Sequence, residues 1–598
     1  MNRREHPRPQ LIRKDWHSLD GKWQFAFDDK NEGLTGKWYH ELPATHEIMV
    51  PFTYETELSG IHDPSHHRIV WYQTTFEADS SDNQVLYFEG VDFESQVWLN
   101  GHQLGTHKGG YERFSFDLEP YLTVGTNTIT LRVEDSLSCE QPRGKQRWLK
   151  DNFGCWYVQT TGIWKSVWLE KAPAQRLDYL KLTPDLDNDL VKIEVELKDA
   201  SVLPDTPNWF VEAEATFDGQ LVSSHKGLLG HNMGGFTLDT RVKGDACWGT
   251  KKWETHAPEL YDLTVRLYDE AGNVLDEVLS YFGMRKISID NGQIMLNNHS
   301  LYQRLILDQG YWAESGITPP SVDALETDID RILEMGYNGL RKHQKLEDER
   351  FLYLCDTKGM LVWSEMPSTY VFNDVAVQQF TDEWLQIVKQ YYNHPSIITW
   401  VPFNESWGIK GINVLERPQK FTEGIYYLTK AIDPYRPVIT NDGWEHTISD
   451  ILTLHDYEET GEAFANRYSD HKDFAVHGYS NKEQIVNNEK QFNRDWFAFA
   501  SDSSYKGQPI VISEFGGIAF TADEEDQWGY GNQVKDEAEF MARFEKIHAA
   551  IQDIPYLAGF CYTQLTDVEQ EVNGLLTPDR EPKVDLVEVK RINEKRVK

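Results

Sequence analysis

Two glutamates follow apolar segments and are themselves followed by residues that favour turns. Glu405 ends the segment IITWVPFNE and precedes Ser-Trp-Gly, and Glu514 ends IVISE and precedes Phe-Gly-Gly. Two carboxylates at one site suit the hydrolysis of a glycosidic bond: one group protonates the leaving oxygen, and the other attacks or stabilises the oxocarbenium-like centre. This chemistry requires both side chains to reach the same sugar.

The segment 284–598 supplies a fold that can bring the two glutamates together. Apolar, strand-like runs alternate there with helix-like stretches, and eight such runs are present. Eight repeats of strand and helix predict a (β/α)₈ TIM barrel, in which parallel strands close around a packed core. Glu405 ends the fourth predicted strand and Glu514 the seventh. Both would therefore lie on the rim where barrel enzymes place their active sites.

Other polar residues end the predicted strands and would share this rim. A lone glutamate at a strand end is more often a solvated charge or the partner of an arginine, so the candidates must be judged as a set. The strand ends carry no Ser or Cys nucleophile motif. Besides the two glutamates, they carry Asp308, Arg341, His343, Glu365, Asn404, Asp442, His455, Tyr457 and Asp567.

Two β domains are expected before the barrel. Residues 1–175 contain short alternating runs separated by turns, and Asn100-Gly101 lies between two of them as a strong hairpin signal. Residues 176–283 have the same character, and their length fits one immunoglobulin-like sandwich. The prediction is a jelly-roll-like β-sandwich, an immunoglobulin-like β-sandwich and a TIM barrel.

Two segments of the predicted barrel are longer than its other loops. They cover residues 458–508, before the seventh strand, and 518–532, after it. Long ordered loops in compact domains are usually functional, so we expect both to form walls of the site.

Three segments together resemble one family of enzymes. NHPSIITWVPFNESWG (393–408) and VISEFGG (511–517) are similar to the acid/base and nucleophile motifs of glycoside hydrolase family 2, which includes β-galactosidases, β-glucuronidases and β-mannosidases. GCWYVQTTGIWKSVWLE (154–170) resembles the end of the sugar-binding-like first domain of that family. The resemblance covers nearly the whole chain and implies glycosidase activity without a cofactor.

The resemblance also implies roles for individual residues. Glu405 matches the general acid/base, and Asn404 matches the residue that binds the sugar 2-hydroxyl. Glu514 matches the nucleophile, and Arg341 matches the cation that keeps the nucleophile ionised. Tyr457 matches a tyrosine that donates a hydrogen bond to the nucleophile. We expect Glu405 to be protonated near neutral pH and Glu514 to be ionised, which permits double displacement with retention of configuration.

Five further residues are candidates for substrate binding. His343 lies in RKHQK, where the family has R-x-S-H-Y, so its spacing differs. Asp308 could hold distal hydroxyls or cap a loop, and Glu365 could bind a hydroxyl or form a rim ion pair. Trp528 could form an apolar platform for a sugar or pack within its loop. Tyr562 takes the place of a tryptophan platform in many relatives and offers a smaller ring.

The identity of the sugar stays open at the level of the sequence. β-Glucuronidases of the family carry an Asn-x-Lys pair that binds the sugar carboxylate, but here Asn573 is followed by Gly574 and Leu575. We therefore expect an exo-acting β-galactosidase. The alternatives are a glucuronide, a mannoside or an α-L-arabinopyranoside as substrate, or a non-catalytic sugar-binding barrel. An epimer differs in the direction of one hydroxyl, which a single hydrogen bond can select.

Composition limits the partners of the chain. The formal net charge is −37 and the pI is about 4.9, which disfavours binding to nucleic acid or to an anionic membrane surface. The first residues lack the apolar core of a signal peptide, so we expect a cytoplasmic protein. Asp567, Glu569 and Glu571 form an acidic cluster without a dedicated cage, and no metal is expected. The partners expected are a small carbohydrate or glycoside and, from the family resemblance, further copies of the chain.

Overall fold

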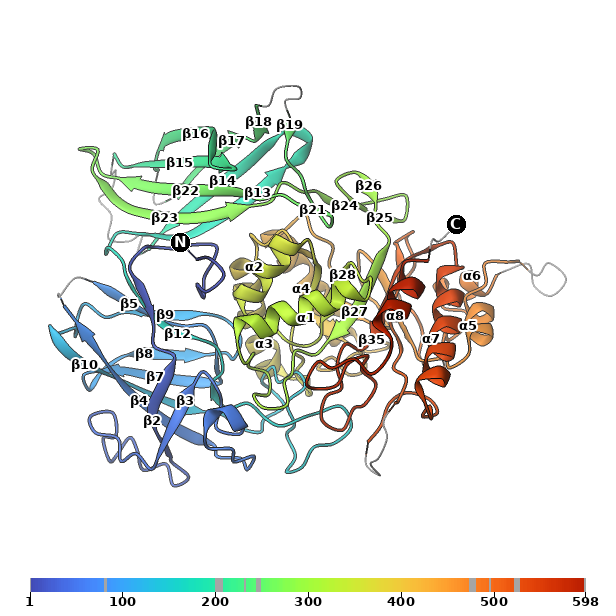
Figure 1. Cartoon of the computed structure of the whole chain (residues 1–598), viewed down its shortest axis with the longest axis horizontal. Helices are drawn as coiled ribbons and strands as arrows, with labels where there is room; N and C mark the ends of the chain where they lie inside the picture. Colours follow the sequence, from blue (N-terminus) through green and yellow to red (C-terminus); the bar gives the residue numbers. More distant parts are fainter. Residues whose placement is uncertain are drawn as a thin grey trace.

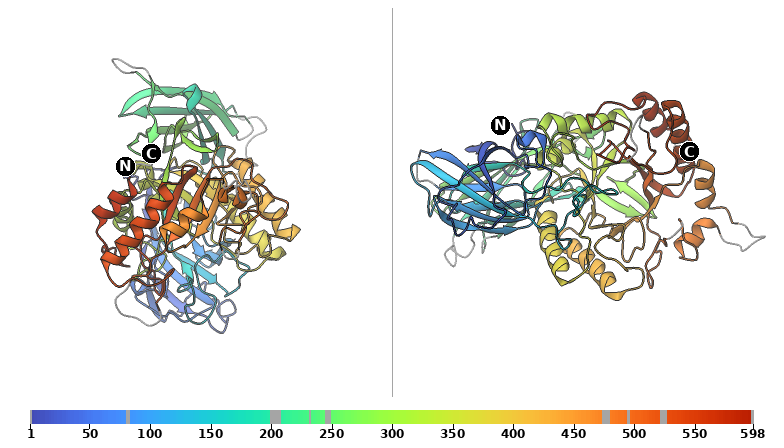
Figure 2. Two further views of the ribbon diagram at one scale, coloured as in Figure 1. Left: turned by 90° about the vertical axis from the view of Figure 1, so that its right-hand side faces the viewer. Right: turned by 90° about the horizontal axis from the view of Figure 1, so that it is seen from below.

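The computed structural model describes residues 2–79, 83–198, 208–230, 233–243, 249–472, 480–493, 496–520 and 527–595. Two β-sandwiches and a helix-covered parallel barrel follow one another along the chain (Figure 1). Both sandwiches flank the barrel on the side opposite to its last helices, and a view from below shows the first sandwich beside the barrel (Figure 2). The predicted fold class is confirmed.

The first sandwich consists of two antiparallel sheets around an apolar core. Its hairpin signal is confirmed: Asn100 and Gly101 have φ angles of 51° and 79° and connect two paired strands. One sheet has the order β1 (Trp16–Ser18), β12 (Val167–Lys171), β5 (Gln84–Phe88) and β9 (Phe114–Asp117). The other has the order β3 (His46–Val50), β2 (Gly21–Phe27), β4 (Ile69–Ala78), β10 (Gly125–Glu134), β7 (Glu94–Leu99) and β8 (His102–Lys108).

The second sandwich shows the alternation expected of half-buried strands. Along β15 (Phe210–Phe217), for example, every second residue is buried, starting with Val211. One sheet has the order β13 (Leu177–Asp185), β14 (Leu190–Leu197) and β17 (Met233–Asp239). The other has the order β16 (Gln220–Leu228), β15, β22 (Tyr261–Tyr268) and β23 (Val274–Phe282).

Parallel strands form the barrel, and their order follows the chain. Neighbouring strands are β30 (Ile397–Val401), β29 (Leu361–Glu365), β28 (Gly339–Lys342), β27 (Gln303–Asp308), β35 (Leu557–Thr563), β34 (Ile510–Gly516) and β33 (Leu452–Asp456). The ring continues through the short parallel pair β31 (Phe403–Asn404) and β32 (Asn441–Asp442). The fifth strand, expected over 437–443, is therefore regular only at Asn441 and Asp442, although Val438 also forms a parallel bridge to Trp400.

Amphipathic helices cover the outside of the barrel. Helix α1 is representative: the Ser321 side chain accepts a hydrogen bond from the backbone N–H of Ala324, and Leu325, Ile329 and Ile332 are buried against the sheet. Helix α1 spans Val322–Glu334. The other helices are α2 (Glu349–Lys358), α3 (Asp374–Gln390), α4 (Glu416–Ile432), α5 (Gly461–Arg467), α6 (Asn481–Val486), α7 (Glu537–Gln552) and α8 (Leu586–Asn593). Across the described part of the chain, none of the helices has the length and apolarity needed to span a membrane.

A segment of the first sandwich reaches onto the rim of the barrel. The backbone N–H groups of Arg143 and Gly144 donate to the carbonyl of Ser368, which lies in the loop after β29. Gly144 has a φ of 59°, and a Cβ at this position would lie 2.5 Å from the carbonyl oxygen of Gln344. Only glycine allows this approach without displacement of the neighbouring loop.

Candidate active site

Arg341, at the end of β28, is the centre of the rim. Its side chain is fully buried, and three carboxylates and one amide surround the guanidinium. Nε lies 2.5 Å from Glu365, Nη1 lies 2.7 Å from both Asp442 and Glu514, and Nη2 donates to Asn404 at 2.7 Å. From the second strand, one arginine therefore holds side chains of the third, fourth, fifth and seventh strands of the barrel.

Glu514 receives a donor on each carboxylate oxygen. Oε1 pairs with Arg341 at 2.7 Å, and Oε2 accepts a hydrogen bond from the hydroxyl of Tyr457 at 2.5 Å. The ring of Tyr457 stacks on Tyr530, with 3.4 Å between the ring centroids and 3° between the planes. The structure thus brings together three of the residues predicted from the sequence and adds Tyr530, which lies two residues after Trp528 and was not among the candidates.

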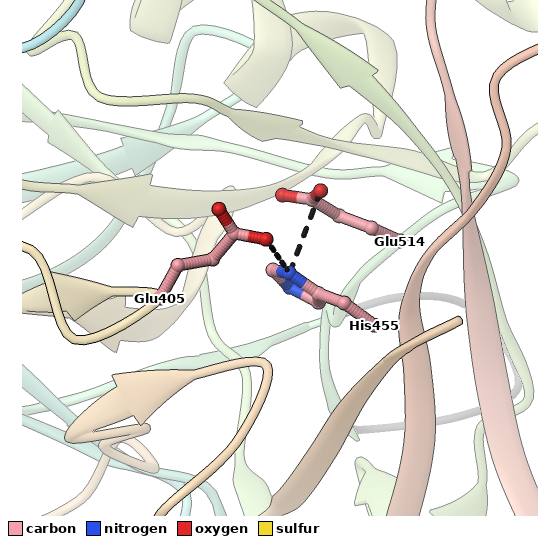
Figure 3. A group of neighbouring side chains, drawn as sticks. All are labelled: Glu405, His455 and Glu514. Carbon is pink, nitrogen blue, oxygen red and sulfur yellow. Dashed lines mark hydrogen bonds and ion pairs between the residues drawn. The ribbon is translucent and has the colours of Figure 1, made fainter. Parts of the chain in front are cut away.

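His455, near the end of β33, lies between the two glutamates (Figure 3). Its Nδ1 is 2.8 Å from Glu405 and 3.4 Å from Glu514, and its Nε2 is 2.8 Å from Asp442. Burial disfavours the charged imidazole, but the negative charges of Glu514 and Asp442 and two hydrogen bonds outweigh burial and raise the pKa of His455 to about 10. The surrounding carboxylates therefore favour the cationic form of His455.

The pKa of Glu405 depends on its hydrogen bond and ion pair with His455. Burial favours the neutral carboxyl, but the hydrogen bond and charge of His455, together with Lys145 and Arg341, lower the pKa of Glu405. This direction is opposite to the one that a protonated Glu405 requires, and the protonation of Glu405 expected from the sequence stays a prediction. His455 was among the residues at the predicted strand ends, but its contact with both glutamates was not predicted.

The turn after β31 aims Glu405 at this cluster. Glu405 and Ser406 have φ angles of 50° and 60°, in the left-handed region that residues with a Cβ rarely adopt. The backbone N–H of Glu405 donates to the carbonyl of Asp442, and that of Ser406 donates to the side chain of Asn441. These hydrogen bonds hold a strained turn, a feature that concentrates at functional sites.

Glu405, His455 and Glu514 also have the spacing of a metal-ligand set. One ligand atom from each residue lies within 4.8 Å of the others. Both ring nitrogens of His455 already face carboxylates, and Arg341 pairs with Glu514, so basic side chains of the protein already contact both glutamates. The prediction that no metal is needed stays a prediction.

Two of the candidate binding residues, His343 and Glu365, belong to the charged group around Arg341. His343 Nδ1 lies 3.0 Å from Glu365 and 4.0 Å from Glu514. Burial, followed by the charges of Lys145 and Arg341, lowers the pKa of His343 well below its usual value, so this ring is neutral. Glu365 is fully buried and pairs with Arg341, as the ion-pair alternative anticipated.

The other three candidates contact protein groups in the structure. The carboxylate of Asp308 pairs with Lys342 at 2.5 Å and accepts a hydrogen bond from the backbone N–H of Gly310. The half-buried Trp528 donates from Nε1 to the carbonyl of Gly154 at 2.8 Å. Tyr562 is fully buried among apolar and aromatic side chains, including Phe515 and Phe544, and its ring has no exposed face for stacking on a sugar.

The first sandwich contributes a cation to the site. Lys145 follows the closely packed Gly144 and is 8% exposed. Burial opposes its charge, but Cys155, Glu571, Glu514 and Glu405 raise the pKa of the ammonium group. Lys145 could not be predicted from the sequence, because its position depends on the docking of two units that lie far apart along the chain.

A cavity of about 800 Å³ opens beside Glu405. Both oversized loops contribute to its walls, as expected: residues from 458–508 and from 518–532 line it, although 521–526 lie outside the described residues. The lining consists of Glu405, Trp444, His455, Asp456, Tyr457, Glu458, Glu459, Thr460, Arg467, Asn493, Trp496, Tyr530, Gly531 and Asn532.

Family models match all three domains of the chain. The chain matches "Glycosyl hydrolases family 2, sugar binding domain" over residues 16–173, "Glycosyl hydrolases family 2" over 175–285 and "Glycosyl hydrolases family 2, TIM barrel domain" over 287–597. The barrel match covers more than half of the chain. This protein belongs to glycoside hydrolase family 2.

Named relatives carry two different activities. A β-galactosidase of Pseudoalteromonas haloplanktis is 25% identical over 96% of this chain but only 55% of its own length, and a β-glucuronidase of Chlorocebus aethiops is 24% identical over 85% of this chain and 79% of its own length. The chain spans about half the length of the β-galactosidases that it matches. The crystal structure of Ruminococcus gnavus β-glucuronidase has a TM-score of 0.77 at 18% identity and covers 98% of this chain and 99% of its own, which shows a shared fold.

Proposed function

We propose that this protein is a retaining exo-β-glycosidase, in which Glu514 is the nucleophile and Glu405 the acid/base. The observation that carries the proposal is the closeness of the two glutamates: one carboxylate oxygen of Glu405 lies within 4.8 Å of one carboxylate oxygen of Glu514. Retaining glycosidases typically have about 5–5.5 Å between the two groups, whereas inverting enzymes leave about 6.5–9.5 Å for a water molecule. The long loops around the cavity favour release of a single terminal sugar.

The first step transfers the sugar to the enzyme. An oxygen of Glu514 bonds to the anomeric carbon while the bond from that carbon to the leaving oxygen breaks. His455, 2.8 Å from Glu405, passes its proton along their hydrogen bond to Glu405, and Glu405 delivers that proton to the leaving oxygen, so that Glu405 is again an anion and the imidazole is neutral. Arg341 and Tyr457 hold the attacking carboxylate in position.

The second step returns the enzyme to its resting state. The ester at Glu514 has lost its negative charge, and Glu405 is now an anion beside a neutral imidazole. Glu405 removes a proton from water, the water oxygen bonds to the anomeric carbon, and the bond to Glu514 breaks. The proton passes back to His455, and the released sugar has the same anomeric configuration as the substrate.

A β-galactoside is the first candidate for the substrate. Curated relatives of the chain include several β-galactosidases. The Asn-x-Lys pair of the family's glucuronidases is missing at Asn573, which is followed by Gly574 and Leu575. The buried side chain of Asn573 donates a hydrogen bond to Glu571 at 3.1 Å.

A β-glucuronide is the second candidate, and Lys145 favours it. This buried cation carries no ion pair within 4.0 Å among those found in the described part of the chain, yet its charge acts on Glu405, Glu514 and Glu571. An ammonium group in this place could bind the carboxylate of a uronic acid from a side of the site that the family motif does not use.

A panel of 4-nitrophenyl glycosides tests the proposal. The set comprises the β-D-galactoside, β-D-glucoside, β-D-mannoside, β-D-glucuronide and α-L-arabinopyranoside, assayed at neutral pH. Release from one member identifies the sugar, and NMR of the first-formed product identifies the stereochemistry. Inversion of the anomeric configuration would refute the roles given to the two glutamates. If folded protein released 4-nitrophenol from none of the five glycosides, a non-catalytic sugar-binding barrel would be favoured.

We further propose a homo-oligomer, which the family resemblance supports. Light scattering from the purified protein should give a mass of at least twice the 69.5 kDa of one chain. A monomeric mass at assay concentration would contradict this.

A further inference from the structure

The cavity beside Glu405 has one aromatic wall. Trp444 and Trp496 stack with 4.5 Å between ring centroids and 1° between planes. Trp444 contacts His455 edge to face at 5.5 Å, so the stack extends outward from the catalytic centre. Trp444 is 9% exposed, and the outer ring, Trp496, is half-buried. Trp496 therefore offers accessible ring surface within the cavity.

The backbone holds Trp496 in place. Its N–H donates to the side chain of Asn493, whose own amide donates to the carbonyl of His455 at 3.2 Å. The carbonyl of Trp496 accepts from the N–H of Phe492, and the N–H of Glu445 donates to the carbonyl of Phe497. This loop is thus connected both to the catalytic strand and to the turn that carries Trp444.

The cavity also has a polar, acidic wall. Glu458 pairs with Arg467 at 2.9 Å, and Glu459 accepts hydrogen bonds from the backbone and side chain of Asn532. Arg467 also pairs with Asp456 at 2.5 Å. With Glu405, the lining contains four carboxylates against two basic side chains, Arg467 and His455, and this excess of negative charge disfavours an anionic occupant.

We propose that this cavity binds a neutral sugar as the leaving group, with one face of its ring stacked on Trp496. Of the two glutamates, Glu405 lines the cavity, and the acid/base is the group that faces the leaving oxygen. An aromatic ring covers the C–H face of a pyranose, and carboxylate and amide groups bind its hydroxyls. The substrate class is then a β-linked disaccharide or oligosaccharide, in contrast to an alkyl or aryl conjugate.

The inference rests on the proposed glycosidase activity, and the experiment separates the two. Trp496→Ala is compared with the unaltered protein on two substrates that share the preferred glycone: the glycosyl fluoride, which has no leaving sugar, and the disaccharide with glucose as leaving group. For galactose these are β-D-galactosyl fluoride and lactose. We expect kcat/KM for lactose to fall about tenfold or more while that for the fluoride changes less than about twofold.

Two further variants serve as controls. Trp496→Phe keeps an aromatic face and should retain most activity on lactose. Trp209→Ala removes a half-buried tryptophan from the second sandwich and should leave the ratio of the two kcat/KM values unchanged.

Each outcome bears on a different claim. Equal losses of Trp496→Ala on both substrates, or an unchanged rate on lactose, would overturn the subsite. Failure of the unaltered protein to cleave any glycosyl fluoride of the panel sugars would overturn the proposed activity instead. A preference for glucuronate over glucose as acceptor from the glycosyl-enzyme would refute the neutral character of the occupant, because the acidic wall should repel that anion.

Discussion

Replacement of His455 by glutamine should alter how the stability of the protein depends on pH. The folded-state pKa of about 10 lies above the ordinary histidine value of 6.5, which corresponds to about 5 kcal/mol of stabilisation as an upper limit. Because the pKa is raised on folding, this stabilisation is fully present below pH 6.5. It is lost as the pH rises from 6.5 through about 10, where the folded protein also releases the proton.

The glutamine variant is neutral throughout this range and lacks the contribution. Urea unfolding of both proteins, followed at pH 6, 7.5, 9 and 10, should show a gap in midpoint that is largest at pH 6 and shrinks toward pH 10. The measured quantity is the difference in stability between the two proteins, so the contributions of lysines and tyrosines that titrate in both proteins cancel. A gap of constant size would show that the imidazole is not a cation in the folded state and would refute the assignment of the resting proton to His455.

Three further substitutions test the assigned roles. Glu514→Ala should abolish turnover on the preferred 4-nitrophenyl glycoside, and azide should restore it with formation of an α-glycosyl azide; activity of this variant without azide would contradict the nucleophile assignment. Glu405→Ala should lower kcat/KM by at least about a hundredfold for glycosides with poor leaving groups and far less for 2,4-dinitrophenyl glycosides, and a uniform loss would argue against acid catalysis. Lys145→Met should lower kcat/KM for the glucuronide about tenfold more than for the galactoside if the ammonium binds a uronate, and equal effects on both would remove that role.

Much of the fold followed from the sequence because its signals are local. The hairpin turn at Asn100-Gly101 depends on two neighbouring residues, and the barrel depends on a repeated alternation of strand and helix. Glu405 and Glu514 could be placed on one rim because parallel strands of a closed barrel end on the same side.

The parts of the site that were missed depend on contacts between distant segments. Tyr530 stacks on Tyr457 from another loop, and Lys145 reaches the rim only through docking of the first sandwich. The charge of His455 arises from three carboxylates that meet only in the folded barrel. No periodicity or short motif contains such information.

The close packing of Gly144 against the barrel makes the active site a joint product of two folding units. The barrel alone would contain both glutamates yet lack the wall that includes Lys145. If the chain were cut between the two units, neither part alone would contain the complete site. Recovery of activity on mixing the parts would then report whether the first sandwich has docked, and the catalytic rate would measure assembly as well as chemistry.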